Sequence, residues 1–192
     1  MNQEEYGRGN PRTLLLLHGS GLGPWMWRNI AESFAQRGYH VCVPALSGHS
    51  SAWQTPFVSI GKEADRLLEW VDDQEGGHLF GVLGFSLGAQ IGVEMLARRN
   101  DLADKAVIES ALVHPAPFAA AAAGLTKLGW PLVRSRGFTR LQAAAMRGRS
   151  DQFEDRWEGR RRMTKESVSA VVQAGFSYEL PAAFRTQRAE LL

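Results

Sequence analysis

The sequence is poor in cysteine and in long apolar runs. Cys42 is the only cysteine among 192 residues, which excludes a disulfide framework, a thiolate metal cluster and a Cys-x-x-Cys redox pair. It lies in the apolar run 41–43, where a buried structural cysteine is expected. The longest apolar runs, 14–17 and 118–123, fall far short of the roughly 20 residues that a membrane-spanning helix needs. We therefore expect no membrane span.

A strong excess of charge is also absent. The chain has 22 basic and 20 acidic residues, a net charge of +2, and this balance argues against a nucleic-acid partner. Residues 1–5 are polar and acidic, whereas a signal peptide needs a basic start and an apolar stretch. With 44% hydrophobic residues the chain is expected to fold as a globular, cytoplasmic protein.

Short apolar runs alternate with amphipathic stretches over the first part of the chain. Buried strands are expected at residues 13–17, 39–43, 80–85 and 105–109. Helices are expected around 30–35, ending at Gly38, and over 60–75 and 87–99, with Ser59 capping the second of them. This alternation predicts an α/β fold with a doubly wound, mostly parallel sheet. We expect the four strands in the order second, first, third, fourth.

The alternation of expected strands and helices ends beyond Pro115. Prolines, an alanine run and arginine-rich amphipathic stretches replace the strand pattern, and alanine favours helix. The sequence therefore predicts three parts: a core at 1–114, a helical cap at 115–180, and the start of a further core segment at 181–192. The run 188–192 is typical of the approach to another strand.

Gly84-Phe85-Ser86-Leu87-Gly88 matches the pattern G-x-S-x-G between an expected strand and an expected helix. In that context the pattern is a nucleophile elbow, a strained turn that presents the serine at a helix N-terminus. The amide of Leu87 would then face negative charge that develops on a substrate oxygen. The alternative is a glycine turn whose serine only caps the helix.

A second glycine-rich turn, Gly19-Ser20-Gly21, follows the first expected strand. Glycines let backbone amides approach a ligand closely. We expect the amide of Ser20 to be the second donor to the substrate oxygen, paired with that of Leu87.

These motifs together resemble the α/β-hydrolase superfamily over roughly residues 6–114, with 115–178 similar to its variable cap. The resemblance implies a serine hydrolase of the esterase type with nucleophile Ser86, and substrate contacts from Gly19, Gly21, Trp25 and Phe85. It also leaves lyase or peroxidase chemistry open. Ala45 and Ser50 depart from the family pattern, and no opening antiparallel strand is evident before Pro11.

The family order places the acid and the histidine of the triad after the serine. His114 is the only histidine after Ser86, and it comes too early for the family pattern. We expect either a fragment truncated at its C-terminus before the triad is complete, weak or inactive on its own, or a complete chain in which His114 is the base and Glu109 its acid. The earlier histidines have structural explanations: His18 is expected to bind backbone at the glycine turn and His49 to hold its own loop.

The cap carries a local excess of positive charge. Between 134 and 165 there are ten basic residues and four acidic ones, an excess of 10 − 4 = +6. Such a run is typical of solvated helix faces, and the alternative is guidance of an anionic acyl substrate.

The predicted function is hydrolysis of an ester or a related small-molecule acyl substrate through a Ser86 acyl-enzyme, without cofactor and without metal. The competing hypothesis is a binding protein that retains the fold but lacks the base. Because the sheet would end at the strand 105–109, its open edge predicts possible self-association.

Overall fold

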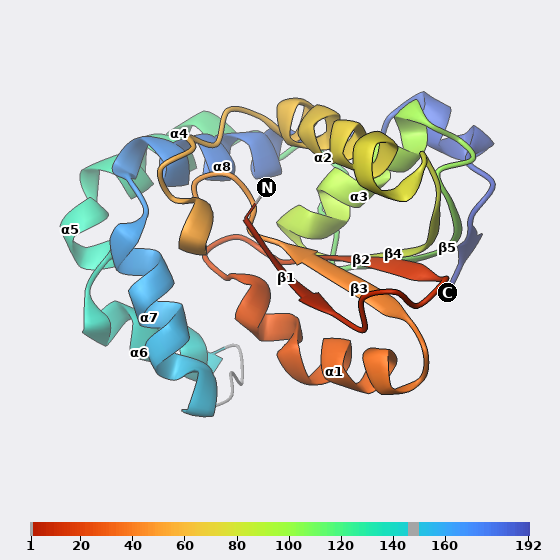
Figure 1. The fold of residues 1–192 in the computed structure, drawn as a ribbon. Helices are drawn as coiled ribbons and strands as arrows, with labels where there is room; N and C mark the ends of the chain where they lie inside the picture. Colours follow the sequence, from red (N-terminus) through yellow and green to blue (C-terminus); the bar gives the residue numbers. More distant parts are fainter. Residues whose placement is uncertain (1, 146–149) are drawn as a thin grey trace.

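In this computed structural model, which describes residues 2–145 and 150–192, six strands form one mixed sheet in the order β1-β3-β2-β4-β5-β6 (Figure 1). The strands are β1 Gln3–Tyr6, β2 Thr13–Leu17, β3 His40–Pro44, β4 Leu79–Phe85, β5 Ala103–Glu109 and β6 Glu190–Leu191. The neighbours β3, β2, β4 and β5 are parallel. The predicted order of the four central strands is therefore confirmed.

Helices cover both faces of the sheet. Helix α1 (Arg28–Gln36) lies on one face, and α2 (Ile60–Glu75) and α3 (Leu87–Arg98) lie on the other (Figure 1). All five residues of β2 are buried. Its leucines alternate, so that Leu14 and Leu16 pack in one core cluster with Ala31 of α1, and Leu15 and Leu17 pack in the other with residues of α2 and α3. A continuous apolar run is thus a strand buried on both sides.

The helix ends agree with their sequence signals. The hydroxyl of Ser59 accepts a hydrogen bond from the Lys62 amide at the start of α2. Gly76 ends that helix with φ +65°, and Gly38 follows α1 with φ +84°, both in the left-handed region where glycine is favoured.

An antiparallel strand precedes the first expected one, which corrects the sequence prediction. Strand β1 pairs with β3 in the register Gln3↔Pro44 to Tyr6↔Val41. The sequence Gln-Glu-Glu-Tyr has no apolar alternation, because β1 is an edge strand whose residues are only half-buried. Tertiary pairing, rather than local pattern, makes it a strand.

Helices follow β5 and lie at one end of the sheet (Figure 1). They are α4 Ala119–Leu128, α5 Trp130–Val133, α6 Arg136–Ala145, α7 Phe153–Arg162 and α8 Lys165–Ser177, with the short 3-10 turn η3 Ser150–Gln152 directly before α7. Three more 3-10 turns lie elsewhere: η1 Pro24–Trp27, η2 Ser50–Ala52 and η4 Ala182–Thr186. We call α4 to α8 the cap. The part of 115–180 that is described holds no strand.

The edge at β5 is partly covered, which corrects the expectation of an open fourth strand. Strand β6 pairs in parallel with β5 at Lys105↔Glu190 and Ala106↔Leu191. The expected approach to another strand at 188–192 is thus a short strand. None of the helices in the described residues is long and apolar enough to cross a membrane.

Candidate active site

Ser86 occupies a sharp turn between β4 and α3. Its backbone has φ +54° and ψ −113°, a conformation that a residue with a side chain adopts only under strain. The turn is held on both sides, because the Ser86 amide donates to the Glu109 carbonyl at 2.9 Å and the Ser86 carbonyl accepts from the Gln90 amide at 3.0 Å. The serine side chain therefore projects from a fixed backbone.

The two glycines of the motif are required by close backbone contacts. A Cβ on Gly84 would lie 2.6 Å from the Gly88 carbonyl oxygen, and a Cβ on Gly88 would lie 2.3 Å from the Leu17 carbonyl oxygen. Both distances are shorter than real Cβ atoms show. The spacing G-x-S-x-G thus lets α3 start directly against the end of β2.

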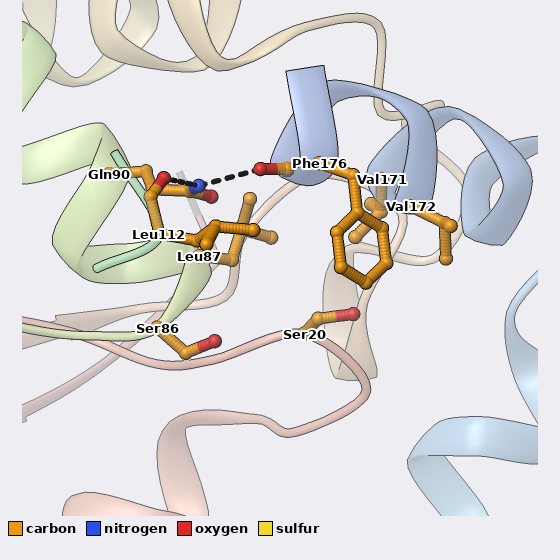
Figure 2. A pocket seen from close by; sticks show the side chains of 9 residues that line it. Ser20, Ser86, Leu87, Gln90, Leu112, Val171, Val172 and Phe176 are labelled. Atoms are coloured by element: carbon orange, nitrogen blue, oxygen red, sulfur yellow. Dashed lines mark hydrogen bonds between the residues drawn. The ribbon is translucent and has the colours of Figure 1, made fainter. Parts of the chain in front are cut away.

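A cavity of about 190 Å3 lies above this turn. Ser86 and Ser20 lie along one side of it, with the Ser86 hydroxyl turned toward Ser20, and the Phe176 ring of α8 lies above Ser20 (Figure 2). The lining residues are Ser20, Ser86, Leu87, Gln90, Leu112, Val171, Val172, Gly175 and Phe176. The Leu87 amide lies in the first turn of α3, where N–H groups have no acceptor within the helix. The cavity combines two hydroxyls and a helix N-terminus with a mostly apolar wall.

Gln90 joins the cap to this site, a role that the sequence analysis missed. Its side-chain amide donates to the Leu112 carbonyl at 2.6 Å and to the Gly175 carbonyl at 2.8 Å (Figure 2). The side chain is 3% exposed. The sequence signal for this role is Gln90 itself, a single polar amide within the apolar segment that follows the elbow, since buried polar groups need hydrogen-bond partners.

Glu109 and His114 do not line the cavity of Ser86. Both residues are exposed. The backbone carbonyl of Glu109 accepts the hydrogen bond from the Ser86 amide. In the part of the chain that the structure describes, neither side chain is hydrogen-bonded to Ser86.

The four expected substrate contacts are dispersed. Gly19 packs on the neighbouring ring of Phe85, where a Cβ would approach a ring carbon to 2.9 Å. Trp25 is 5% exposed and its ring lies under the Arg156 guanidinium. Gly21 lines a second cavity together with Ser20. Of these four residues, Gly21 is the one placed at a cavity next to that of Ser86.

His18 and His49 are buried behind the glycine turn, with ring centroids 5.4 Å apart. Nε2 of His18 accepts from the Leu46 amide at 3.1 Å, so Nδ1 carries the proton and donates to the Gly19 carbonyl at 3.0 Å. His49 donates from Nδ1 to the Ser47 carbonyl at 2.9 Å. The loop-holding roles expected for both histidines are confirmed.

Burial keeps these two imidazoles neutral. It lowers the pKa of His18 to about 3, with a further lowering from His49, and it lowers the pKa of His49 as well. Both groups are protonated in the unfolded chain below pH 6.5 while they stay neutral in the folded chain, so their contribution to stability is present above pH 6.5 and is lost as pH falls.

We therefore expect the free energy of unfolding to fall on acidification below pH 6.5, by about 1.4 kcal/mol per pH unit for each histidine. In the His18→Gln variant the slope should decrease by about that amount between pH 6.5 and about pH 5, because one of the two groups no longer titrates. Urea unfolding at a series of pH values measures the slope. An unchanged slope would show that His18 is not kept neutral in the folded protein.

A group of potential metal ligands lies at the opposite end of the sheet strands. Ligand atoms of Glu5, His40 and Cys42 lie within 4.8 Å of one another. Nε2 of His40 is 2.6 Å from the Glu5 carboxylate, and its Nδ1 faces Thr13 and Glu75. Hydrogen bonds and ion pairs within the cluster account for this arrangement.

Known proteins share both the sequence pattern and the fold. The chain is 29% identical over 130 residues to the thermostable monoacylglycerol lipase of Bacillus sp. (strain H-257), covering 63% of this chain and 48% of the lipase. The chain thus spans about half the length of the curated relative that it matches.

Solved structures with low sequence identity share the fold. A carboxylesterase structure from Nitrososphaera gargenis superposes with a TM-score of 0.79 at 15% identity, over 99% of this chain and 74% of that one. A thermophilic esterase from Thermogutta terrifontis gives a TM-score of 0.74 at 19% identity, over 93% of this chain and 68% of that one. The model of the alpha/beta hydrolase family matches residues 14–192. Together with the elbow, the strand order and the cap, this match shows that the chain belongs to the alpha/beta hydrolase family.

Proposed function

We propose that the protein is a serine hydrolase that cleaves small acyl esters through an acyl-enzyme on Ser86. The observation that carries the proposal is the position of Ser86, at φ +54° in the turn before α3 and on the floor of a cavity shared with Ser20 and Leu87. Amides at a helix start and in a glycine turn are suited to stabilise the oxyanion of a tetrahedral intermediate. The esterase and lipase relatives support an ester as the substrate class.

The chemistry follows from these positions. The Ser86 hydroxyl oxygen attacks the ester carbonyl, its proton passes to a base or to water, and the alcohol leaves with a proton. The amides of Ser20 and Leu87 hold the negative oxygen in between. Water then releases the acid from the acyl-enzyme. The apolar wall formed by Leu112, Val171 and Phe176 is suited to a short acyl chain.

The test is trapping of the acyl group. After incubation with p-nitrophenyl butyrate and acid quenching, we expect one butyryl group on the peptide that carries Ser86. Ser86→Ala should abolish the adduct. Ser110→Ala is the matched control, because Ser110 is also a serine with positive φ, +57°, at the end of a strand, and it does not line the cavity. Butyrylation elsewhere, or its persistence in Ser86→Ala, would refute the nucleophile assignment.

The second candidate is a binding protein without turnover. It is favoured by the positions of the acid and base candidates Glu109 and His114, since neither lines the cavity of Ser86. A chain that binds acyl amides in this cavity but never forms the butyryl adduct would support it.

We also propose that the sheet edge at β5 mediates self-association. Strand β6 pairs with β5 at Lys105 and Ala106, so in the described chain the rest of β5 has no strand partner on that side. Unpaired strand edges can pair with strands of other chains. An apolar hollow of about 430 Å3 lies there, lined by Val93, Ile108, Val113, Leu180, Phe184, Leu191 and Leu192 among others.

Size-exclusion chromatography with light scattering at low micromolar concentration is expected to show dimers or larger species. Leu191→Asp should shift the protein toward monomer, because it puts a charge at the edge. Leu141→Asp is the control, since Leu141 is even more exposed, at 69% against 52% for Leu191, but lies on α6. A wild-type chain that elutes as a monodisperse monomer would contradict the proposal.

A further inference from the structure

A second cavity, of about 180 Å3, adjoins that of Ser86. Ser20 and Val172 line both cavities. The second cavity lies between the glycine turn and the cap, and its other lining residues are Gly21, Thr126, Trp130, Val133, Phe138, Gln142, Arg160, Met163 and Val168. A ligand bound at Ser86 can thus extend past Ser20 into the cap.

Arg160 is the charged group of this second cavity. The residue is only 6% exposed. Its guanidinium donates to two neutral acceptors, the Gln142 side-chain oxygen and, at 3.5 Å, the Val133 carbonyl. Its Nε is buried without a partner. Among the described residues no carboxylate forms an ion pair with it, and residues 146–149 contain no acidic side chain.

A second buried arginine increases the positive charge beside it. Arg156, one turn earlier on α7, is 7% exposed, and its Nη1 is also buried without a partner. Its guanidinium stacks over Trp25, with 5.5 Å to the ring centroid. Burial and the neighbouring Arg156 lower the pKa of Arg160 to about 10, so the group remains charged at neutral pH.

Buried charges in proteins are normally paired, because an uncompensated charge carries a desolvation cost of several kcal/mol. Within the described residues Arg156 and Arg160 have no carboxylate partner, so binding of an anion beside them would offset the desolvation cost of their buried charges. A carboxylate suits the planar donor geometry of a guanidinium. Since no carboxylate of the described chain pairs with Arg160, an anion bound to it would be a ligand, and the cavity that Arg160 lines gives it room.

We infer that Arg160 makes the second cavity an anion subsite, and that the substrate is an acyl ester bearing a carboxylate remote from the bond that Ser86 attacks. This inference rests on the proposed chemistry at Ser86 and names the substrate class of that same site. Gly21 belongs to the subsite, because a Cβ there would lie 3.1 Å from Nη2 of Arg160. The excess of positive charge in the cap thus has two parts: surface arginines such as Arg162, and two buried ones.

The test measures binding and so does not need turnover. The probes are the monomethylamide of adipic acid, whose amide replaces the ester and whose far end is a carboxylate, and N-methylhexanamide, which has the same length and no charge. Isothermal titration calorimetry on the full chain should show tighter binding of the charged amide. Arg160→Gln should weaken that binding by about 10- to 100-fold, the range for hydrogen bonds to charged groups, and should leave the neutral amide within about twofold.

Two further variants separate recognition from structure. Arg162→Gln is the matched control, because Arg162 lies on the same helix, is exposed and pairs with Glu158 at 3.5 Å; its binding of both amides should equal that of wild type. Arg160→Lys keeps the charge but not the planar fork, and it should retain part of the preference for the charged amide.

The outcomes distinguish this inference from the proposed function. Equal binding of the two amides by wild type, or equal loss of both in Arg160→Gln, would overturn the anion subsite and assign Arg160 a structural role in the cap. Selective loss of the charged amide supports the subsite even if no butyryl adduct forms on Ser86, in which case only the proposed hydrolysis fails.

Discussion

Replacing Gly88 with alanine is expected to destabilise the fold by about 3 kcal/mol, the upper part of the range for overpacked sites. The added methyl would lie 2.3 Å from the Leu17 carbonyl oxygen and 2.8 Å from that of His18. Both obstacles are backbone atoms at the end of a central strand, so neither can rotate away. Helix α3 would have to move off β2, and the turn at Ser86 would move with it.

The control lies one turn further along the same helix. A Cβ on Gly92 would approach only side-chain carbons, those of Val82 at 3.4 Å and Ile108 at 3.6 Å. Since alanine is favoured over glycine in a helix by about 1 kcal/mol, Gly92→Ala should be neutral or stabilising. Urea unfolding of both variants decides the matter. Equal stability of Gly88→Ala and wild type would mean that the elbow is not held by close packing against β2.

The parts of the fold that could be predicted are those coded by local pattern. The leucine run of β2 and the elbow after β4 indicate buried parallel strands, because residues covered on both faces must be apolar throughout. The sequence of β1 contains no apolar run or alternation. Its half-buried residues Glu4 and Glu5 adopt the strand conformation because they pair with β3. Strand β6 was expected only as the approach to a strand at 188–192, and its two residues, Glu190 and Leu191, are both exposed.

The floor of the candidate site could be predicted, but its walls could not. Ser20, Ser86 and Leu87 belong to motifs whose spacing reflects backbone geometry, and the structure brings them to one cavity. Gly175 and Phe176 reach it from α8, and the hydrogen bond from Gln90 to Gly175 spans 85 positions in sequence. A single sequence does not reveal such a distant contact. The positive charge of the cap can be counted from the sequence, but a count does not tell which arginines are buried.

The other prediction with a large effect concerns the rate of hydrolysis. No imidazole or carboxylate lines the cavity of Ser86 among the described residues, and His18 and His49 are buried and engaged with backbone. A serine hydroxyl without a base is a weak nucleophile. When a triad member is missing, binding and oxyanion stabilisation leave a rate only ~10³–10⁴-fold above that in water.

We therefore expect residues 1–192 to hydrolyse p-nitrophenyl butyrate at about 10³–10⁴ times the rate in water, far below the 10⁶-fold or more that is typical of enzymes. His114→Ala and Glu109→Gln should change this rate by less than about twofold, because a general base contributes about 10²–10⁴-fold only when it reaches the reacting proton. Release of p-nitrophenol, followed at several enzyme concentrations, measures the three rates. A rate in the range of full enzymes that collapses in both variants would place His114 and Glu109 at Ser86 in the working protein, and the exposed positions of both side chains would then have to change when substrate binds.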